Sequence, residues 1–176
     1  HGVRAVLGAG TGLGQAILVW QGRRYEVFPT EGGHADFAPA DEEQVELWRY
    51  LRNRHGHVSA ERVVSGPGLV DVYAFVRERG GDAGSPQLTD AIQKGDPAAA
   101  ISHAALLSGD PLALQALDLF IRVYGAQAGN VALAVLARGG IYLAGGIAPR
   151  IVEKLRDGSF IRAFHSKGRM SALLQG

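Results

Sequence analysis

Three short apolar and β-branched runs open the chain, and each predicts a β-strand. They cover residues 3–7, 15–20 and 25–28, and glycine-rich or polar stretches separate them. Because runs of this length joined by short turns normally pair as hairpins, the simplest arrangement is a three-strand antiparallel meander. Its turns fall at residues 8–14 and 21–24.

Helical signals dominate the middle of the chain. Asp41 followed by Gln44 has the form of a capping box, and apolar residues continue at helical spacing from there to Gly56. The segment SGPGL at 65–69 opens a second helix. Two N-caps followed directly by proline, at Asp96 and Asp110, predict two more, and the last of these extends to about residue 137.

A fourth strand and a last helix complete the predicted order. The apolar run 141–144 ends in two glycines and predicts a buried strand, and residues 149–156 predict a helix. A strand between the first two helices is left open. This order predicts the α/β fold class, with a mixed sheet that begins with the antiparallel meander and is flanked by helices.

Composition and charge exclude several classes of protein. Hydrophobic residues make up 47% and charged residues 20%, ordinary globular values that exclude disorder. The net charge of +1 argues against a nucleic-acid partner, and the lack of cysteine excludes disulfides and thiolate zinc sites. No apolar run reaches the roughly 18 residues of a membrane span. No signal peptide opens the chain, so we expect a cytoplasmic protein without a membrane partner.

The glycine-rich turn at residues 8–14 is the first candidate for ligand binding. In a dinucleotide fingerprint the sixth position would be glycine, but here it falls on Leu13 or Gln15, and no Lys-Ser/Thr follows as in a Walker loop. A β-rich run comes next, so we expect a hairpin tip whose backbone N–H groups around Thr11 can hold phosphate oxygens. The alternative is a plain glycine-rich turn.

Glu31 and His34 form the second candidate, on a loop with two glycines between them. They are too few to bind a metal, and no serine or cysteine stands at a spacing that would make a nucleophile–base pair. A carboxylate accepts hydrogen bonds from hydroxyl groups and an imidazole donates or accepts them, so recognition of a hydroxyl-bearing solute fits better. The alternative is a solvated loop.

Two further candidates lie beside glycine turns. Glu61 stands in an apolar or small run just before a Gly-Pro-Gly turn, and an ion pair with Arg62 is the alternative explanation for it. Gly145 and Gly146 follow the strand at 141–144, at the carboxyl end where open α/β sheets bind ligands. The alternative there is a simple tight turn.

Taken together, four segments closely resemble the bacterial glucokinase family, in order and spacing, along nearly the whole chain. They are GTGLG at 10–14, EGGHADF at 31–37, SAERVVSGPGL at 59–69 and AGGIAPR at 144–150. The resemblance implies an actin-like, ribonuclease H-like ATPase domain of the hexokinase type. It also implies an enzyme, an ATP-dependent glucokinase that phosphorylates the 6-hydroxyl of glucose. A related group of sugar kinases and repressors usually carries a Cys-rich zinc loop, and the lack of cysteine separates this chain from it.

The resemblance also implies roles for individual residues. Mg²⁺ would arrive bound to ATP, and this chain would supply no metal ligand. Glucose and ATP would be the small-molecule partners. A homodimer is among the expected assemblies. Glucose would be bound by Glu31, His34 and Glu61. The nucleotide would be bound by Gly10, Thr11, Gly12 and Gly14 of the second phosphate loop and by Gly145 and Gly146 on the adenosine side.

Two parts of the family pattern are missing from residues 1–176: an Asp-x-Gly-Gly-Thr phosphate loop and the Asn-Asp pair that carries the catalytic base. We therefore expect a partial larger domain of a two-domain sugar kinase, with the smaller N-terminal domain and the C-terminal end absent. The base Asp would lie upstream, so the chain would hold no catalytic residue and be inactive alone. The runner-up is a non-catalytic sugar-sensing or regulatory fragment. A third hypothesis, an actin-type assembly module, leaves Glu31, His34 and Glu61 unexplained.

Overall fold

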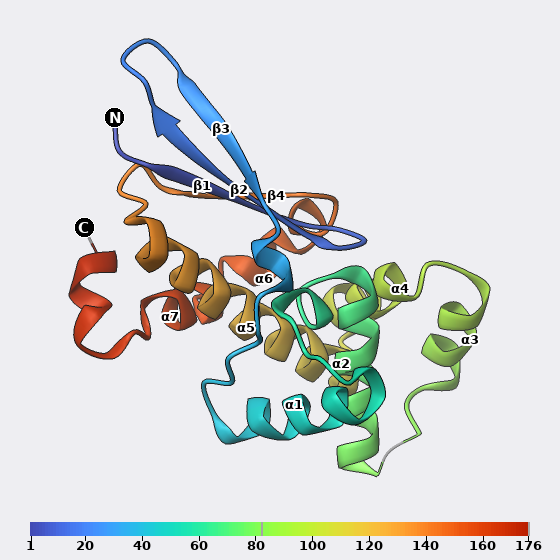
Figure 1. Ribbon diagram of the computed structural model, residues 1–176. Coiled ribbons are helices and arrows are strands. Elements are labelled where there is room, and N and C mark those ends of the chain that lie inside the picture. Colours follow the sequence, from blue (N-terminus) through green and yellow to red (C-terminus); the bar gives the residue numbers. More distant parts are fainter. Residues whose placement is uncertain (82, 176) are drawn as a thin grey trace.

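A four-stranded mixed sheet forms one side of the molecule (Figure 1). The computed structural model describes residues 1–81 and 83–175. The strands are β1 (Arg4–Ala9), β2 (Leu13–Trp20), β3 (Tyr25–Thr30) and β4 (Ile141–Ala144), in the order β3-β2-β1-β4. The first three pair antiparallel and β4 lies parallel to β1. The predicted meander and the predicted fourth strand are confirmed, with bounds shifted by at most two residues.

Helices pack along one face of the sheet and extend away from it (Figure 1). The long helix α5 lies next to β1 with α7 beside it, and α2 and α4 pack on the far part of α5. The helices are α1 (Glu42–His55), α2 (Gly66–Gly80), α3 (Pro86–Lys94), α4 (Pro97–His103), α5 (Pro111–Val135), α6 (Val152–Leu155) and α7 (Ser159–His165). Shorter helical turns cover Gly32–His34, Ala60–Arg62, Ala104–Ser108, Ala148–Ile151 and Gly168–Leu174.

The N-caps predicted at Asp41, Asp96 and Asp110 are confirmed, and the structure adds Ser65 as the N-cap of α2. The side chains of Asp41, Ser65, Asp96 and Asp110 each accept a hydrogen bond from a backbone N–H in the first turn of their helix. At the other end of α1, Gly56 ends the helix with a positive φ of 75°. An N-cap hydrogen bond from such a side chain typically stabilises a helix by about 1 kcal/mol. The starts of these helices are therefore fixed by residues next to them in the sequence.

Two expectations differ from the structure. The strand left open between α1 and α2 does not form. The chain makes an isolated bridge between Asp36 and Ser59 and then turns into Ala60–Arg62, because the Ser59 hydroxyl caps that turn. The helix predicted over 149–156 is divided into Ala148–Ile151 and α6, since the backbone of Ile151 (φ −119°, ψ 20°) is not helical.

The centre of the core lies where α5 meets β1. Tyr124 on α5 is fully buried, and its hydroxyl donates a hydrogen bond to the carbonyl oxygen of Leu7 at 3.1 Å. Its ring packs edge-on against Phe160 of α7 at 5.5 Å between ring centroids. The next residue, Gly125, lets α7 come close, because a Cβ there would overlap the backbone of Phe160. The sheet, α5 and α7 are therefore joined at one point.

We expect this tyrosine to make stability fall in alkaline solution. Burial raises the pKa of Tyr124 to about 12, from its ordinary value of 10.0. The folded state then holds a proton that the unfolded state releases, so this contribution is complete below pH 10 and is lost as the pH rises to about 12. The loss amounts to about 2–3 kcal/mol. Denaturant unfolding from pH 8 to pH 12 measures it, and Tyr124→Phe is the control that should lack this part of the slope.

Membrane-span criteria single out no individual helix in the described part of the chain. The segments Pro97–Ser108 and Pro111–Val135 meet these criteria only as a pair, and they are bent by 111° relative to each other.

Candidate functional site

The glycine-rich turn is the tip of a β-hairpin, as the sequence predicts. Ala9 pairs with Leu13 across the hairpin, and the Gly10 N–H donates to the Gly12 carbonyl oxygen at 2.8 Å. The Gly10 carbonyl oxygen in turn accepts a hydrogen bond from the N–H of Gly66, at the start of α2, at 2.7 Å. The tip is therefore fixed between the sheet and α2, so its backbone groups are held in place before any ligand arrives.

Glu31, His34 and Glu61 lie together beside this tip. One carboxylate oxygen of Glu61 accepts the backbone N–H of Leu13 at 2.9 Å, and the other lies 3.8 Å from Nδ1 of His34. Nε2 of His34 lies 3.8 Å from a carboxylate oxygen of Glu31. The side chain of Glu61 is 29% exposed, whereas those of His34 and Glu31 are 61% and 92% exposed. The cluster is thus anchored at Glu61 and open to solvent at Glu31.

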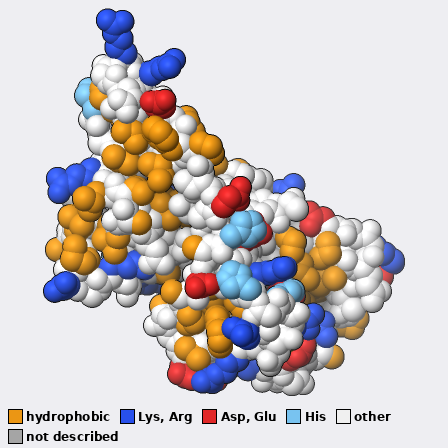
Figure 2. Space-filling model, in the orientation of Figure 1, with side chains coloured by type: hydrophobic (Ala, Val, Ile, Leu, Met, Phe, Trp, Pro, Cys, Tyr) orange, Lys and Arg blue, Asp and Glu red, His pale blue; other side chains and the backbone are white. Residues whose placement is uncertain are grey.

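Pairing between residues 35–37 and 57–60 brings the cluster together across the sequence. The N–H of Ala60 donates to the Ala35 carbonyl oxygen at 2.9 Å, and imidazole Nε2 of His57 lies 2.6 Å from a carboxylate oxygen of Asp36. Histidine and acidic side chains gather on this face between the sheet and the α1–α2 region (Figure 2).

Close backbone contacts explain the glycines around the cluster. A Cβ at Gly33 would overlap the carbonyl oxygen of Leu13, and a Cβ at Gly12 would stand 2.5 Å from the Glu61 carboxylate. The loop after β3 can therefore lie directly on β2, and Glu61 can reach the hairpin tip, only because these positions have no side chain. The absence of side chains at Gly12 and Gly33 therefore sets the position of Glu61 and of the 31–34 turn against the hairpin.

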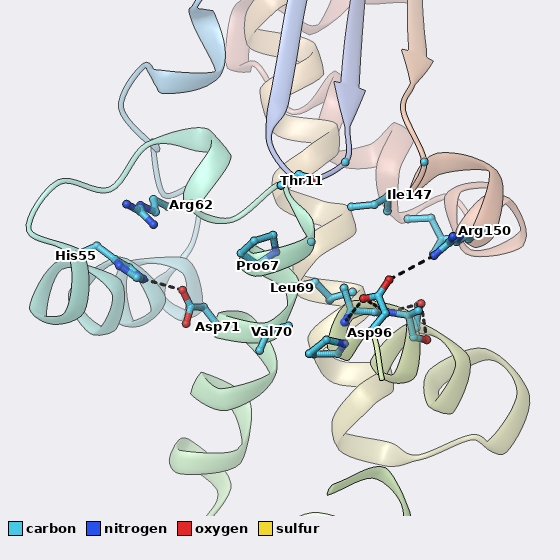
Figure 3. Close-up of a pocket in the computed structure, with 18 residues that line it drawn as sticks. Thr11, His55, Arg62, Pro67, Leu69, Val70, Asp71, Asp96, Ile147 and Arg150 are labelled. Carbon is cyan, nitrogen blue, oxygen red and sulfur yellow. Dashed lines mark hydrogen bonds and ion pairs between the residues drawn. The ribbon is translucent and has the colours of Figure 1, made fainter. Parts of the chain in front are cut away.

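A pocket of about 740 Å³ lies at the same hairpin tip, and the hairpin, α2, α4 and the turn after β4 line it (Figure 3). Thr11 and Pro67 face it from the hairpin and α2. Asp96 caps α4 and lies 3.8 Å from Arg150, which comes from the segment after β4. Another carboxylate in the lining, that of Asp71, is paired with the imidazole of His55 from α1. Backbone donors, hydroxyls and both signs of charge surround a space of the size that ligand sites usually have.

The structure distributes the predicted nucleotide residues unevenly. Gly10, Thr11 and Gly146 line the pocket. Gly12 faces Glu61, as described above. Two others do not line it: Gly14 pairs with Gly8 in the β1–β2 ladder, and Gly145, with φ 85°, packs against the backbone of Ala9.

Sequence reasoning missed the charged residues that line the pocket. Arg62, Asp96 and Arg150 are among them, as are His55 and Asp71, which are paired at 2.7 Å (Figure 3). Arg62 and Arg150 stand inside segments that the sequence already singles out, so proximity to those motifs was the available signal. The α1–α2 pairing of His55 and Asp71 has no signal in the sequence.

The described residues contain no cluster of three or more metal-ligating side chains. The two carboxylates that line the pocket are also engaged, Asp71 with His55 and Asp96 with the first turn of α4 and Arg150.

The mixed sheet, the hairpin tip and the adjoining pocket define a domain of the sugar kinases with the actin-like ATPase fold. The family model described as Glucokinase matches residues 1–176, and the chain belongs to that family. It is 49% identical to a glucokinase of Nostoc sp. over 97% of this chain and 54% of that protein. The chain spans about half the length of the curated relatives it matches.

Solved structures agree with this assignment. The fold is similar to a glucokinase from an Antarctic psychrotroph, with a TM-score of 0.83 and 35% identity, over 97% of this chain and 50% of the other. It is also similar to the glucokinase of Balamuthia mandrillaris in complex with glucose, with a TM-score of 0.84 and 26% identity, over 99% of this chain and 48% of the other.

Proposed function

We propose that the full-length protein transfers the γ-phosphoryl group of ATP to the 6-hydroxyl of glucose, and that residues 1–176 supply part of its larger domain. The observation that carries the proposal is the bond between Glu61 and the hairpin tip. It joins a cluster of hydroxyl acceptors to a tip that also lines a ligand-sized pocket. Sugar and nucleotide would then meet at residues 10–12.

In this proposal each part of the chain orients one substrate. Glu61 is fixed by Leu13, so its second carboxylate oxygen, together with Glu31 and His34, accepts or donates hydrogen bonds around a sugar ring. Backbone N–H groups near Thr11 bind phosphate oxygens, and Gly146 and Arg150 lie on the adenosine side of the pocket. Such positioning supplies much of the rate in phosphoryl transfer, since the reaction asks for little covalent chemistry from the protein.

Several parts of the proposal go beyond the described residues. The carboxylate that takes the proton of the 6-hydroxyl is expected upstream, in the Asn-Asp pair of the family pattern. Mg²⁺ would arrive bound to ATP. A homodimer and a cytoplasmic location stay predictions.

The test is coupled detection of ATP-dependent glucose 6-phosphate formation by the purified full-length protein. We expect turnover with glucose and none with 6-deoxyglucose, which lacks the acceptor hydroxyl but keeps the others. Glucose binding without turnover would contradict the proposal and favour a sugar sensor. Absence of both binding and turnover would contradict the sugar assignment itself.

We expect residues 1–176 by themselves to show no turnover in this assay. The chain offers one wall of a site that family members close between two domains, and closure is what completes the catalytic set in enzymes of this kind. The comparison is the same assay on the full-length protein at equal concentration. Turnover by the shorter chain at a similar rate would mean that the base is not upstream, and Asp36, which is exposed near the cluster, would then be tested first.

A further inference from the structure

Gln15 of β2 packs against the turn at residues 31–34. It stands two positions after Leu13 on β2 and pairs with Thr30 of β3. The hydroxyl of Thr30 donates to the backbone carbonyl oxygen of Gln15 at 3.3 Å and accepts the N–H of Gly32 at 3.2 Å. The start of the turn is therefore tied to the backbone of β2 at Gln15.

The side chain of Gln15 fills the space against Gly32. A Cβ at Gly32 would stand 2.6 Å from both Cδ and Oε1 of Gln15, so a side chain at position 32 would displace the amide from its present position. The amide oxygen is buried, and no donor in the described part of the chain reaches it. A buried oxygen without a donor destabilises a fold, whereas a hydrocarbon of similar shape would not. The amide oxygen of Gln15 thus adds no hydrogen bond to the fold of the described residues.

We propose that Gln15 is a positioning residue for glucose. Its amide supports Gly32 and thereby holds the carboxylate of Glu31 and the imidazole of His34 at the sugar. Its free oxygen accepts a hydrogen bond from the backbone of the turn once the sugar is bound. This role requires that the amide oxygen of Gln15 has no hydrogen-bond partner in the sugar-free protein, because the hydrogen bond to the turn must form only when sugar is bound. This inference rests on the proposed glucokinase function.

The first test replaces Gln15 by Met in the full-length protein, which keeps the length of the side chain and removes the amide. We expect unfolding at the same or a higher temperature, a KM for glucose raised about tenfold or more, and an unchanged KM for ATP. Gln93→Met is the matched control, since Gln93 is exposed on α3, and it should change none of these. An unchanged KM for glucose would overturn the proposal, and so would an equal rise in both KM values.

A second test does not depend on that variant. Gly32→Ala adds a methyl group against the Gln15 amide and should raise the KM for glucose, whereas in a Gln15→Ala background the space is open and the same methyl should have little further effect. Independent, additive effects would overturn the proposal, because residues that act through one contact are non-additive. Wild-type protein without glucose turnover would instead contradict the proposed function, so the two failures are distinguishable.

Discussion

Replacing Glu61 by Gln is expected to raise the KM for glucose of the full-length protein by about 10- to 100-fold, the effect of losing a hydrogen bond to a charged acceptor. Glu61 is the anchored member of its cluster, with one carboxylate oxygen on the N–H of Leu13. Gln keeps an acceptor for that N–H, so the hairpin tip should hold. Its NH₂ group then replaces the oxygen that faces His34, and a sugar hydroxyl loses its acceptor.

The KM for ATP distinguishes the loss of a hydrogen bond to the sugar from a general disturbance of the fold. The pocket and the Glu61 cluster meet the hairpin tip from different elements, so the KM for ATP should change little. Glu42→Gln at the start of α1 is the control, because that carboxylate is 78% exposed and lies 3.9 Å from Arg49. Equal effects of Glu61→Gln on both substrates would contradict its assignment to the sugar.

Local chemistry is what made much of the fold predictable. Asp41, Ser65, Asp96 and Asp110 cap their own helices, so the information that starts α1, α2, α4 and α5 lies within a few residues of each start. The hairpin tip is predictable for the same reason. Its glycines stand between two runs that can only be strands, and the pairing of Ala9 with Leu13 follows from that spacing.

Contacts between distant segments account for the rest. Ser59 caps the turn Ala60–Arg62 locally, but the position of this turn in the fold is fixed by the pairing of Ala60 with Ala35, which is distant in the sequence. The proximity of Glu31 and Glu61 also depends on that pairing, and was available only through resemblance to a family. The lining of the pocket by Arg62 and Arg150 has the same origin, since the turn Ala60–Arg62 and the segment after β4 meet only in the fold.

Gly145 should be far less tolerant of substitution than its neighbour Gly146, although both stand in one motif. Gly145 has φ 85°, and a Cβ there would overlap the backbone of Ala9, whose carbonyl oxygen accepts the N–H of Ile147 at 3.2 Å. Gly145→Ala therefore combines left-handed strain with a clash against backbone that cannot rotate away. We expect the free energy of unfolding to fall by about 3 kcal/mol or more.

Gly146 provides the matched control for that loss. Its φ lies outside the left-handed region and a Cβ there would meet nothing within 4 Å, so Gly146→Ala should change the free energy of unfolding by less than about 1 kcal/mol. Denaturant unfolding of both variants measures the difference. Because Gly146 lines the pocket, its added methyl group should act on the KM for ATP instead. Similar stability for the two variants would show that the turn relaxes around a side chain at 145. The close approach of β4 to β1 would then not depend on glycine at that position.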